Sequence, residues 1–210
     1  MKNYYTLIDD AELMDIIDSV NIVNKDVLKT CHGRYHTMFV VKHVEYILRK
    51  LGYDEHTVEL GKIAALLHDI GTLTGKKEHA LKSSEMCEYF LDRTNLSEGD
   101  KEMVIHAIKD HSDGEEINSP FGAALFLVDK VDLAKERVLS EDEDEGWYGN
   151  LLEIESTRIT VKNKRITINH VVTPRFSKKI FDSEWIKGKT APKRACDYLG
   201  CECILQINGK

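Results

Sequence analysis

The stretch of residues 64–71, with the sequence AALLHDIG, limits what this chain can fold into more than any other. Four apolar residues lead into an adjacent imidazole and carboxylate, His68 and Asp69, and so carry this pair toward the interior. Buried polar groups are costly unless they are bonded, so the pair needs partners from elsewhere in the chain. One nitrogen donor beside one oxygen donor suits a divalent metal ion. The sequence therefore predicts a buried metal site here.

Apolar residues at three- and four-residue spacing predict helices on both sides of this stretch. The expected helical ranges are 10–20, 24–30, 34–51, 55–69, 78–94, 98–111 and 121–138. Asp54 and Ser97 precede the helices 55–69 and 98–111 as capping residues do, and Gly52 and Gly71 follow the ends of the helices 34–51 and 55–69. The His-Asp pair thus falls in a last helical turn, where adjacent side chains converge more easily than in mid-helix.

The pattern changes after residue 150, where apolar and polar residues alternate. This alternation predicts strands at 159–161 and 165–169, with a hairpin turn at 162–164. Short helices are expected at 178–187 and 191–199, and a last strand at 201–207. The predicted fold class is mainly α, with a helical bundle at 1–140, an acidic linker at 141–150, and a basic α+β extension at 151–210.

The charge is also divided unevenly along the chain. Its net charge is −7, yet residues 151–210 hold 12 Lys or Arg against 6 Asp or Glu, whereas residues 1–150 hold 17 against 30. A basic segment can bind phosphate or nucleic acid. We favour pairing with the acidic half or with the second subunit of a homodimer over nucleic acid, because no pattern of stacking aromatic residues accompanies the charge.

The sequence gives no sign of export or of a membrane. The first five residues lack the basic-then-apolar pattern of a signal peptide, and no apolar run approaches the roughly 20 residues of a membrane span. The five cysteines are scattered and contain no Cys-x-x-Cys, which argues against a disulfide framework or a zinc finger. We therefore expect a cytoplasmic protein with no membrane partner.

Several histidines and aspartates lie at helix ends or interrupt an apolar helix face. They are His36, His68, Asp69, His79, His111 and Asp129. Two divalent ions can share such a set if a carboxylate bridges them, and a pair about 3.5–4 Å apart clamps the oxygens of a phosphate displacement. The mixed nitrogen and oxygen donors favour iron, manganese or zinc over magnesium alone.

The order His36, His68-Asp69 and Asp129, with the string HDIG, resembles the HD-domain metal-dependent phosphohydrolase superfamily over about residues 20–138. His79 in EHALKSSE and His111 in AIKDHS resemble the extra histidines of its dinuclear branch. That branch includes small bacterial enzymes that split diadenosine tetraphosphate symmetrically. The resemblance implies an HD-type helical bundle, a di-iron or di-manganese centre, and attack on phosphorus by a metal-bound hydroxide.

The resemblance also implies a role for each residue of the set. One metal would be held by His36, His68, Asp69 and Asp129, and the second by Asp69, His79 and His111, with Asp69 as the bridge. Zinc, magnesium and nickel remain compatible with these donors. We assign catalytic roles to Asp69 and Lys130.

The chain departs from the family at Thr72, because many HD proteins have a lysine there that could contact phosphate. Lys76, Lys77 and Lys130 are candidate substitutes, and Arg34 and Arg137 are further candidate phosphate contacts. Residues 151–210 have no counterpart in the minimal HD domain.

We therefore predict a metal-dependent phosphohydrolase that cleaves a phosphoester or phosphoanhydride of a nucleotide or dinucleotide polyphosphate. Two alternatives stay open: a regulatory module that binds nucleotide or nucleic acid through a non-catalytic HD site, and an HD-type di-iron oxygenase with the same ligands. His106 lies five residues before His111, about 140° around an ideal helix, and is predicted to be structural or to act behind the ligands. The remaining histidines are assigned to the surface or the core: His32, His43, His56 and His170.

Overall fold

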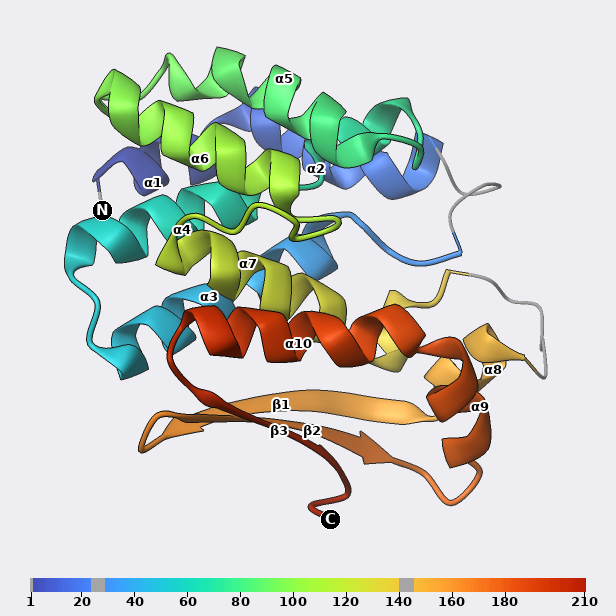
Figure 1. Cartoon of the computed structure of the whole chain (residues 1–210). Helices are drawn as coiled ribbons and strands as arrows, with labels where there is room; N and C mark the ends of the chain where they lie inside the picture. The colour runs from blue at the N-terminus through green and yellow to red at the C-terminus, as the bar shows by residue number, and fades with distance from the viewer. Residues whose placement is uncertain (1, 24–28, 140–145) are drawn as a thin grey trace.

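A helical bundle and a smaller C-terminal sheet make up the computed structural model, which describes residues 2–23, 29–139 and 146–210 (Figure 1). The bundle contains α1 (Lys2–Ile8), α2 (Ala11–Val23), α3 (Arg34–Leu51), α4 (Glu55–Leu67), α5 (His79–Leu91), α6 (Glu98–Asp110) and α7 (Pro120–Val131). Two 3-10 helices follow α4 and α7, namely η1 (Ile70–Thr74) and η2 (Lys135–Arg137). The mainly α fold class is thus confirmed. Helix α1 was not predicted, and the helix expected at 24–30 falls largely outside the described residues.

Local sequence signals account for several helix ends. The side chain of Asp54 accepts a hydrogen bond from Thr57 N at 2.7 Å and begins α4. Ser97 accepts one from Asp100 N at 3.2 Å and begins α6. Gly52 ends α3 in the left-handed conformation with φ 83°, which a residue without Cβ adopts freely. The predicted bounds of these helices are confirmed to within two residues.

Helix α7 ends earlier than predicted. The apolar pattern indicated a helix to residue 138, but α7 stops at Val131 and Asp132 leaves helical geometry with ψ 88°. The next residues bond to a distant segment instead, because Cys31 N donates to Arg137 O and Leu139 N donates to Lys29 O. These long-range backbone bonds replace the helical ones that periodicity alone predicts.

The C-terminal part contains α8 (Trp147–Leu152), β1 (Ile154–Lys162), β2 (Arg165–Val172), α9 (Lys178–Glu184), α10 (Ile186–Tyr198) and β3 (Glu202–Ile207). Strands β1 and β2 form the predicted antiparallel hairpin, and its two turn residues, Asn163 and Lys164, have φ of 51° and 53°. Strand β3 pairs with β2 in parallel. Helix α10 begins before Gly188, which was expected to separate the two helices. Helix α8 begins within the range assigned to the linker and ends within the extension.

Helix α4 is the centre of the bundle, in contact with α1, α3, α6 and α7. Every residue from Val58 to Leu67 is buried. Gly61 allows this crowding, because a Cβ there would lie 2.7 Å from Leu48 Cδ1 and 3.0 Å from Phe121 Cβ. The C-terminal end of α4, which carries the His-Asp pair, is therefore held in the interior.

The C-terminal part packs on two helices that carry predicted ligands. In Figure 1, α10 lies between the bundle and the sheet, where it contacts α7, and β1 contacts α3. None of the described helices combines the length and the apolar character that crossing a membrane requires.

Candidate metal centre

The predicted ligands meet in two groups that share Asp69. The first group contains His36, His68, Asp69 and Asp129, and the second contains Asp69, His79 and His111. Within each group, one donor atom from every residue lies within 4.8 Å of the others. The structure thus brings together all the ligands that the sequence pattern singled out.

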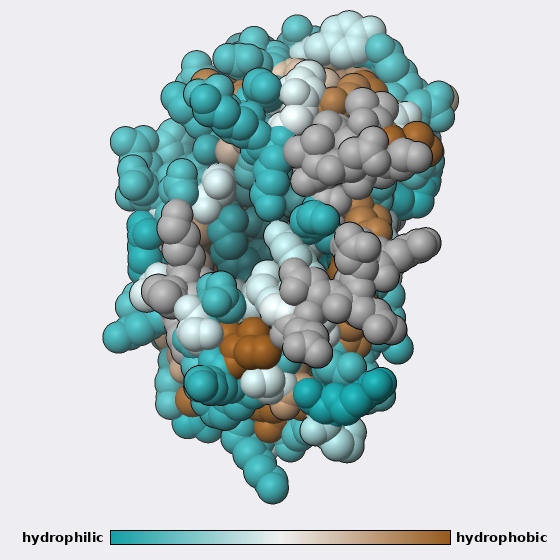
Figure 2. All heavy atoms as spheres, turned by 90° about the vertical axis from the view of Figure 1, so that its right-hand side faces the viewer, coloured by the Kyte–Doolittle hydropathy of each residue, from teal (hydrophilic) through white to brown (hydrophobic). Residues whose placement is uncertain are grey.

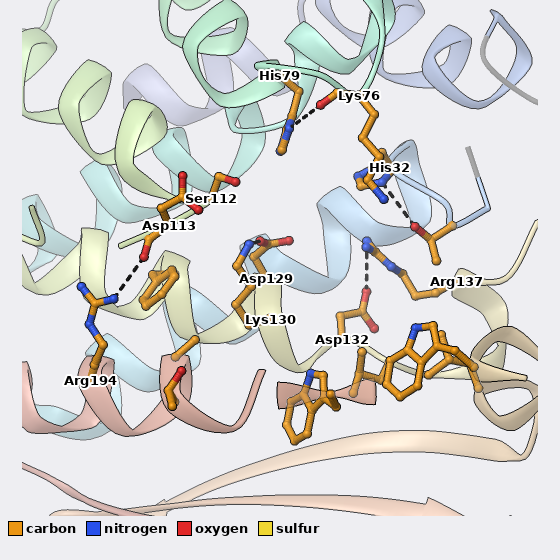
Figure 3. Close-up of a pocket in the computed structure, with 18 of the residues that line it drawn as sticks. His32, Lys76, His79, Ser112, Asp113, Asp129, Lys130, Asp132, Arg137 and Arg194 are labelled. Carbon is orange, nitrogen blue, oxygen red and sulfur yellow. Dashed lines mark hydrogen bonds and ion pairs between the residues drawn. The ribbon is translucent and has the colours of Figure 1, made fainter. Parts of the chain in front are cut away.

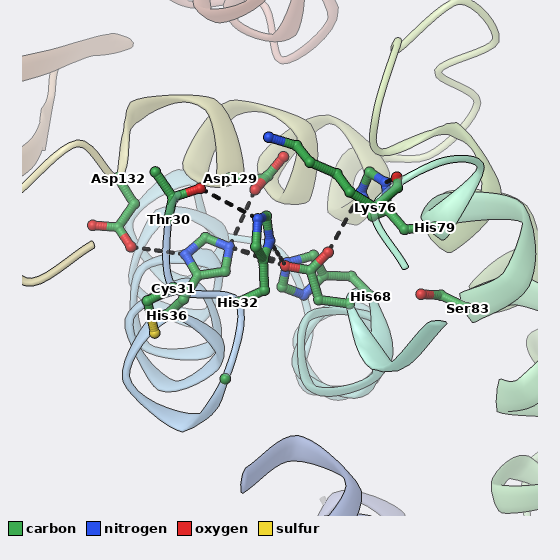
Figure 4. Close-up of polar contacts among 12 residues, drawn as sticks. Thr30, Cys31, His32, His36, His68, Lys76, His79, Ser83, Asp129 and Asp132 are labelled. Carbon is green, nitrogen blue, oxygen red and sulfur yellow. Dashed lines mark hydrogen bonds and ion pairs between the residues drawn. The ribbon is translucent and has the colours of Figure 1, made fainter. Parts of the chain in front are cut away.

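Helix ends supply most members of the first group. His36 lies in the first turn of α3, and His68 is the C-cap of α4. Their Nε2 atoms are 3.2 Å apart and both side chains are fully buried. His36 Nε2 is also 3.2 Å from Asp129 Oδ1, and His68 Nε2 is 3.2 Å from Asp69 Oδ2 (Figure 4).

The second group uses the other oxygen of the shared carboxylate. Asp69 Oδ1 is 3.5 Å from His79 Nε2 and 3.6 Å from His111 Nε2. These two nitrogens are 3.2 Å apart. Asp69 therefore presents Oδ2 to the first group and Oδ1 to the second, as a bridging ligand would.

The outer nitrogen of every imidazole in the two groups is hydrogen-bonded. His68 Nδ1 donates to Ala65 O at 2.8 Å, and His111 Nδ1 donates to Ile108 O at 2.6 Å. Both acceptors are carbonyls three residues back at a helix C-terminus, where carbonyls lack a helical partner. His79 Nδ1 likewise donates to the carbonyl three residues before it, at 3.1 Å.

The fourth imidazole is oriented by a side chain. His36 Nδ1 donates to Asp132 Oδ2 at 2.8 Å, and both side chains are fully buried. With Nδ1 protonated, each of the four rings turns the lone pair of Nε2 inward. This arrangement of donor and outer partner is the one that metal-binding histidines use.

The converging donors fit divalent cations. The Nε2 lone pairs face each other within each pair of histidines, and two carboxylates lie beside them. These electron-rich atoms repel one another unless a positive charge lies among them. Asp69 Oδ1 is buried without a hydrogen-bond partner among the described residues, so it is available as a ligand. Nitrogen and oxygen donors together suit iron, manganese or zinc.

The electrostatics of the site favour positive charge within it. Burial opposes the ionisation of Asp69, but the neighbouring histidines, with His68 foremost, hold the pKa of its carboxyl well below its usual range. Burial likewise opposes ionisation of Asp129, and Lys130 and His36 hold its pKa well below the usual range. Burial lowers the pKa of His68, yet Asp69 outweighs it and the pKa is raised.

His32 also belongs to this site, although it was assigned to the surface or core. It is 8% exposed, and its Nδ1 lies 2.9 Å from Asp69 Oδ2. Burial lowers the pKa of His32 to about 4, so the neutral ring donates Nδ1–H to the carboxylate. The only sequence signal was its position four residues before His36. His106 is in neither group, and its Nε2 is 3.5 Å from Glu116 Oε2.

A cavity of about 580 Å³ lies beside the metal centre (Figure 3). Figure 2 looks onto this side of the molecule, where the surface is hollowed and largely hydrophilic. His32, His79 and Asp129 line the cavity at the centre. Because Asp129 belongs to the first group and His79 to the second, a small molecule in the cavity would contact residues of both groups.

The candidate phosphate contacts are divided between this cavity and the outer surface. Lys76, Lys130 and Arg137 line the cavity. Arg34 instead forms two hydrogen bonds of 2.6 Å to Asp18 on α2, because the start of α3 faces that helix. Neither Arg34 nor Lys77 is among the described residues that line the cavity, so the structure does not bring these two to the site.

Lys130 and Arg137 differ in their partners. Lys130 Nζ lies 2.8 Å from Asp129 Oδ2, beside the first group. Arg137 is 7% exposed, and its Nη1 is 3.9 Å from Asp132 Oδ2. Its Nε and Nη1 atoms have no hydrogen-bond partner within the part of the chain that the structure describes. Arg137 is therefore a buried cation that lines the cavity and is paired with Asp132 by charge rather than by a hydrogen bond.

One wall of the cavity comes from the C-terminal part, which we had not predicted to take part in the site. The residues of this wall are Trp147, Tyr148, Leu151, Trp185, Thr190, Ala191 and Arg194. Arg194 donates to the carbonyls of Asp113 and Gly114 and so ties α10 to the loop that follows His111. Nothing in the sequence linked these segments to residues 36–129.

Comparisons with known proteins identify the family. The model of the HD domain family matches residues 33–150, which include both groups of ligands. No curated protein matches the chain. A solved structure, a predicted HD superfamily hydrolase from an uncultured Thermotogales bacterium, has 23% sequence identity and a TM-score of 0.46, over 57% of this chain and 66% of that chain. The chain belongs to the HD-domain family, whose motif its His-Asp pair resembles.

Proposed function

We propose that this protein hydrolyses a phosphoester or phosphoanhydride of a nucleotide or dinucleotide polyphosphate with two divalent metal ions, iron or manganese, as in the dinuclear branch of the family. The observation that carries this proposal is the position of Asp69, whose two oxygens face two separate groups of imidazoles. A carboxylate in this position suits two ions held close together.

The first group would hold one ion and the second group the other. When bound, divalent cations would lower the pKa of water and stabilise negative charge on phosphate oxygens. The hydrogen bonds at the outer nitrogens fix the tautomer and the orientation of the four imidazoles. The chain thus contributes a rigid set of donors that needs little rearrangement.

The cationic side chains of the cavity would bind the phosphates. Two nitrogens of Arg137, Nε and Nη1, have no hydrogen-bond partner among the described residues, and a guanidinium binds phosphate oxygens in a fixed fork geometry. Lys130 neutralises Asp129 and lies where it can also face a phosphate, and Lys76 lies on the same cavity. Phosphate bound by these side chains would lie directly beside the candidate metal ligands.

A non-catalytic HD module has no need of a complete donor set, and the presence of all the ligands favours an enzyme. The test is to load the purified chain with manganese or iron(II), measure its metal content, and screen nucleotides and dinucleotide polyphosphates for phosphate release. We expect release by the unaltered chain and by His56→Ala, a surface variant, and its loss in Asp69→Ala. A metal-loaded chain that hydrolyses none of these and no generic phosphodiester would contradict the proposal.

The oxygenase alternative is tested in the same assay. Iron-loaded protein is compared with and without dioxygen, and phosphate release should be equal in the two conditions. Turnover that depends on dioxygen would instead support oxygenase chemistry at the same ligands.

A further inference from the structure

Both tryptophans of the chain line the cavity beside the metal centre. Trp147 begins α8, and Trp185 lies between α9 and α10. The two groups of metal donors are drawn instead from residues 36–129. The C-terminal part therefore adds flat aromatic surface to a cavity whose metal donors come from the bundle.

The two rings are held by a third. Phe181 packs against both, with its centroid 6.1 Å from the Trp147 ring at 34° and 4.8 Å from the Trp185 ring at 44°. Trp185 is only 6% exposed, whereas Trp147 is half-buried and keeps part of its ring accessible. One side of Trp147 is thus supported by packing while the ring still lines the cavity.

Arg137 lies on an element next to this aromatic wall, because α8 contacts η2. The cavity therefore offers a flat ring surface close to a buried guanidinium, two of whose nitrogens have no hydrogen-bond partner among the described residues. Its volume of about 580 Å³ falls within the range of small-ligand sites. A ligand with a planar ring joined to a phosphate matches these features together.

We propose that Trp147 determines substrate specificity by stacking on the nucleobase of the substrate while Arg137 binds a phosphate. This inference rests on the proposed function, and it gives the C-terminal part the task of substrate selection. Stacking on an aromatic side chain tolerates different bases, because every base has a flat face. Trp147 should therefore favour nucleotides over sugar phosphates without strong preference for one base.

The test uses AMP and ribose 5-phosphate, which differ by the nucleobase. Binding to the full metal-loaded chain is measured by calorimetry. In Trp147→Ala the Kd for AMP should rise about tenfold, while that for ribose 5-phosphate stays unchanged. Trp147→Phe should restore most of the affinity, and Tyr198→Ala, an exposed aromatic on α10 outside the described cavity lining, should match the unaltered chain.

Fluorescence provides a second readout. Trp185→Phe leaves Trp147 as the one tryptophan of the chain, so AMP should quench its emission and ribose 5-phosphate should not. Equal loss of affinity for both ligands in Trp147→Ala, or no loss for either, overturns the inference. Unchanged Trp147 emission on AMP binding does so as well.

Failure of this inference can be told apart from failure of the proposed function. If Trp147 binds AMP but the metal-loaded chain releases no phosphate, the proposed function fails and the aromatic site stands. If the chain hydrolyses nucleotides and Trp147→Ala leaves KM unchanged, the hydrolase stands and this role of Trp147 is wrong. If Trp147→Ala raises KM for nucleotides with little change in kcat, and its metal content is unaltered, both are supported.

Discussion

Asp132 orients His36 from a position 96 residues later in the chain, through a fully buried hydrogen bond of 2.8 Å between Oδ2 and Nδ1. The bond forms because α7 ends at Val131 and Asp132 leaves helical geometry. The end of a helix that carries one ligand thus fixes the ring of another.

We expect Asp132→Ala to weaken metal binding at the first group by about 10- to 100-fold, because the outer partner of a metal-binding histidine sets its tautomer and orientation. Competition with a chelator measures the affinity, and circular dichroism checks the fold. Glu136→Ala, in η2, serves as a nearby control. An affinity equal to that of the unaltered chain would show that His36 needs no support from Asp132.

Variants of a ligand in one group and of the ligand shared by both groups should show whether each group binds its own ion. His111→Ala removes a donor from the second group alone and should lower bound metal from about two equivalents to about one. Asp69→Ala removes a donor from both groups and should leave less than that. The measurement is metal analysis of protein purified without added metal. One equivalent in the unaltered chain, unaffected by His111→Ala, would reduce the centre to a single ion.

Gly61→Ala should destabilise the protein by about 1–3 kcal/mol, since the new Cβ overpacks the contact of α4 with α3 and α7. Gly99→Ala is the matched control, because it also lies in a helix but its Cβ would meet no described atom within 4 Å. That change should be neutral or stabilise by up to about 1 kcal/mol through helix propensity. Chemical denaturation measures the free energy of unfolding of both variants. Equal effects would mean that the packing around α4 accommodates the added Cβ.

His170 should make the free energy of unfolding depend on pH. Burial lowers its pKa to about 4, from 6.5 in the unfolded chain, and the ring packs against Phe181 and Trp185. Between these two pKa values the unfolded chain binds more protons than the folded chain. The stability that the neutral His170 ring provides is therefore complete above pH 6.5 and is lost as the pH falls toward 4. The loss is about 3 kcal/mol. His170→Gln should flatten this part of the pH curve relative to His56→Gln, an exposed control; parallel curves would contradict the assignment.

Features encoded by neighbouring residues were predictable from the sequence. Asp54 and Gly52 set helix ends through contacts within a few residues, and the hairpin of β1 and β2 needs only a two-residue turn. The candidate ligands were recognisable because each lies at one end of a predicted helix or interrupts an apolar helix face. Their spacing along the chain also matches the family.

Features that depend on distant partners were not predictable in this way. His32 gains its role only through Asp69, 37 residues away. The end of α7 depends on backbone bonds to the segment before α3, and the parallel pairing of β3 with β2 depends on how α9 and α10 cross the sheet. Periodicity within a segment carries no information on such contacts. Arg34 shows the reverse error, since a cation near a ligand in sequence faces Asp18 in space.

The packing of α10 on α7 limits how the sequence of this chain can evolve. Ile166, Ile168 and Ala195 are fully buried and belong to the same hydrophobic cluster as Leu125 of α7 and Val44 of α3. A module that can be exchanged between proteins brings its own core, whereas here the C-terminal part completes the core of the bundle. We therefore expect recombination at residue 150 to yield an unstable bundle, so that new specificities would arise by point substitution in the aromatic wall.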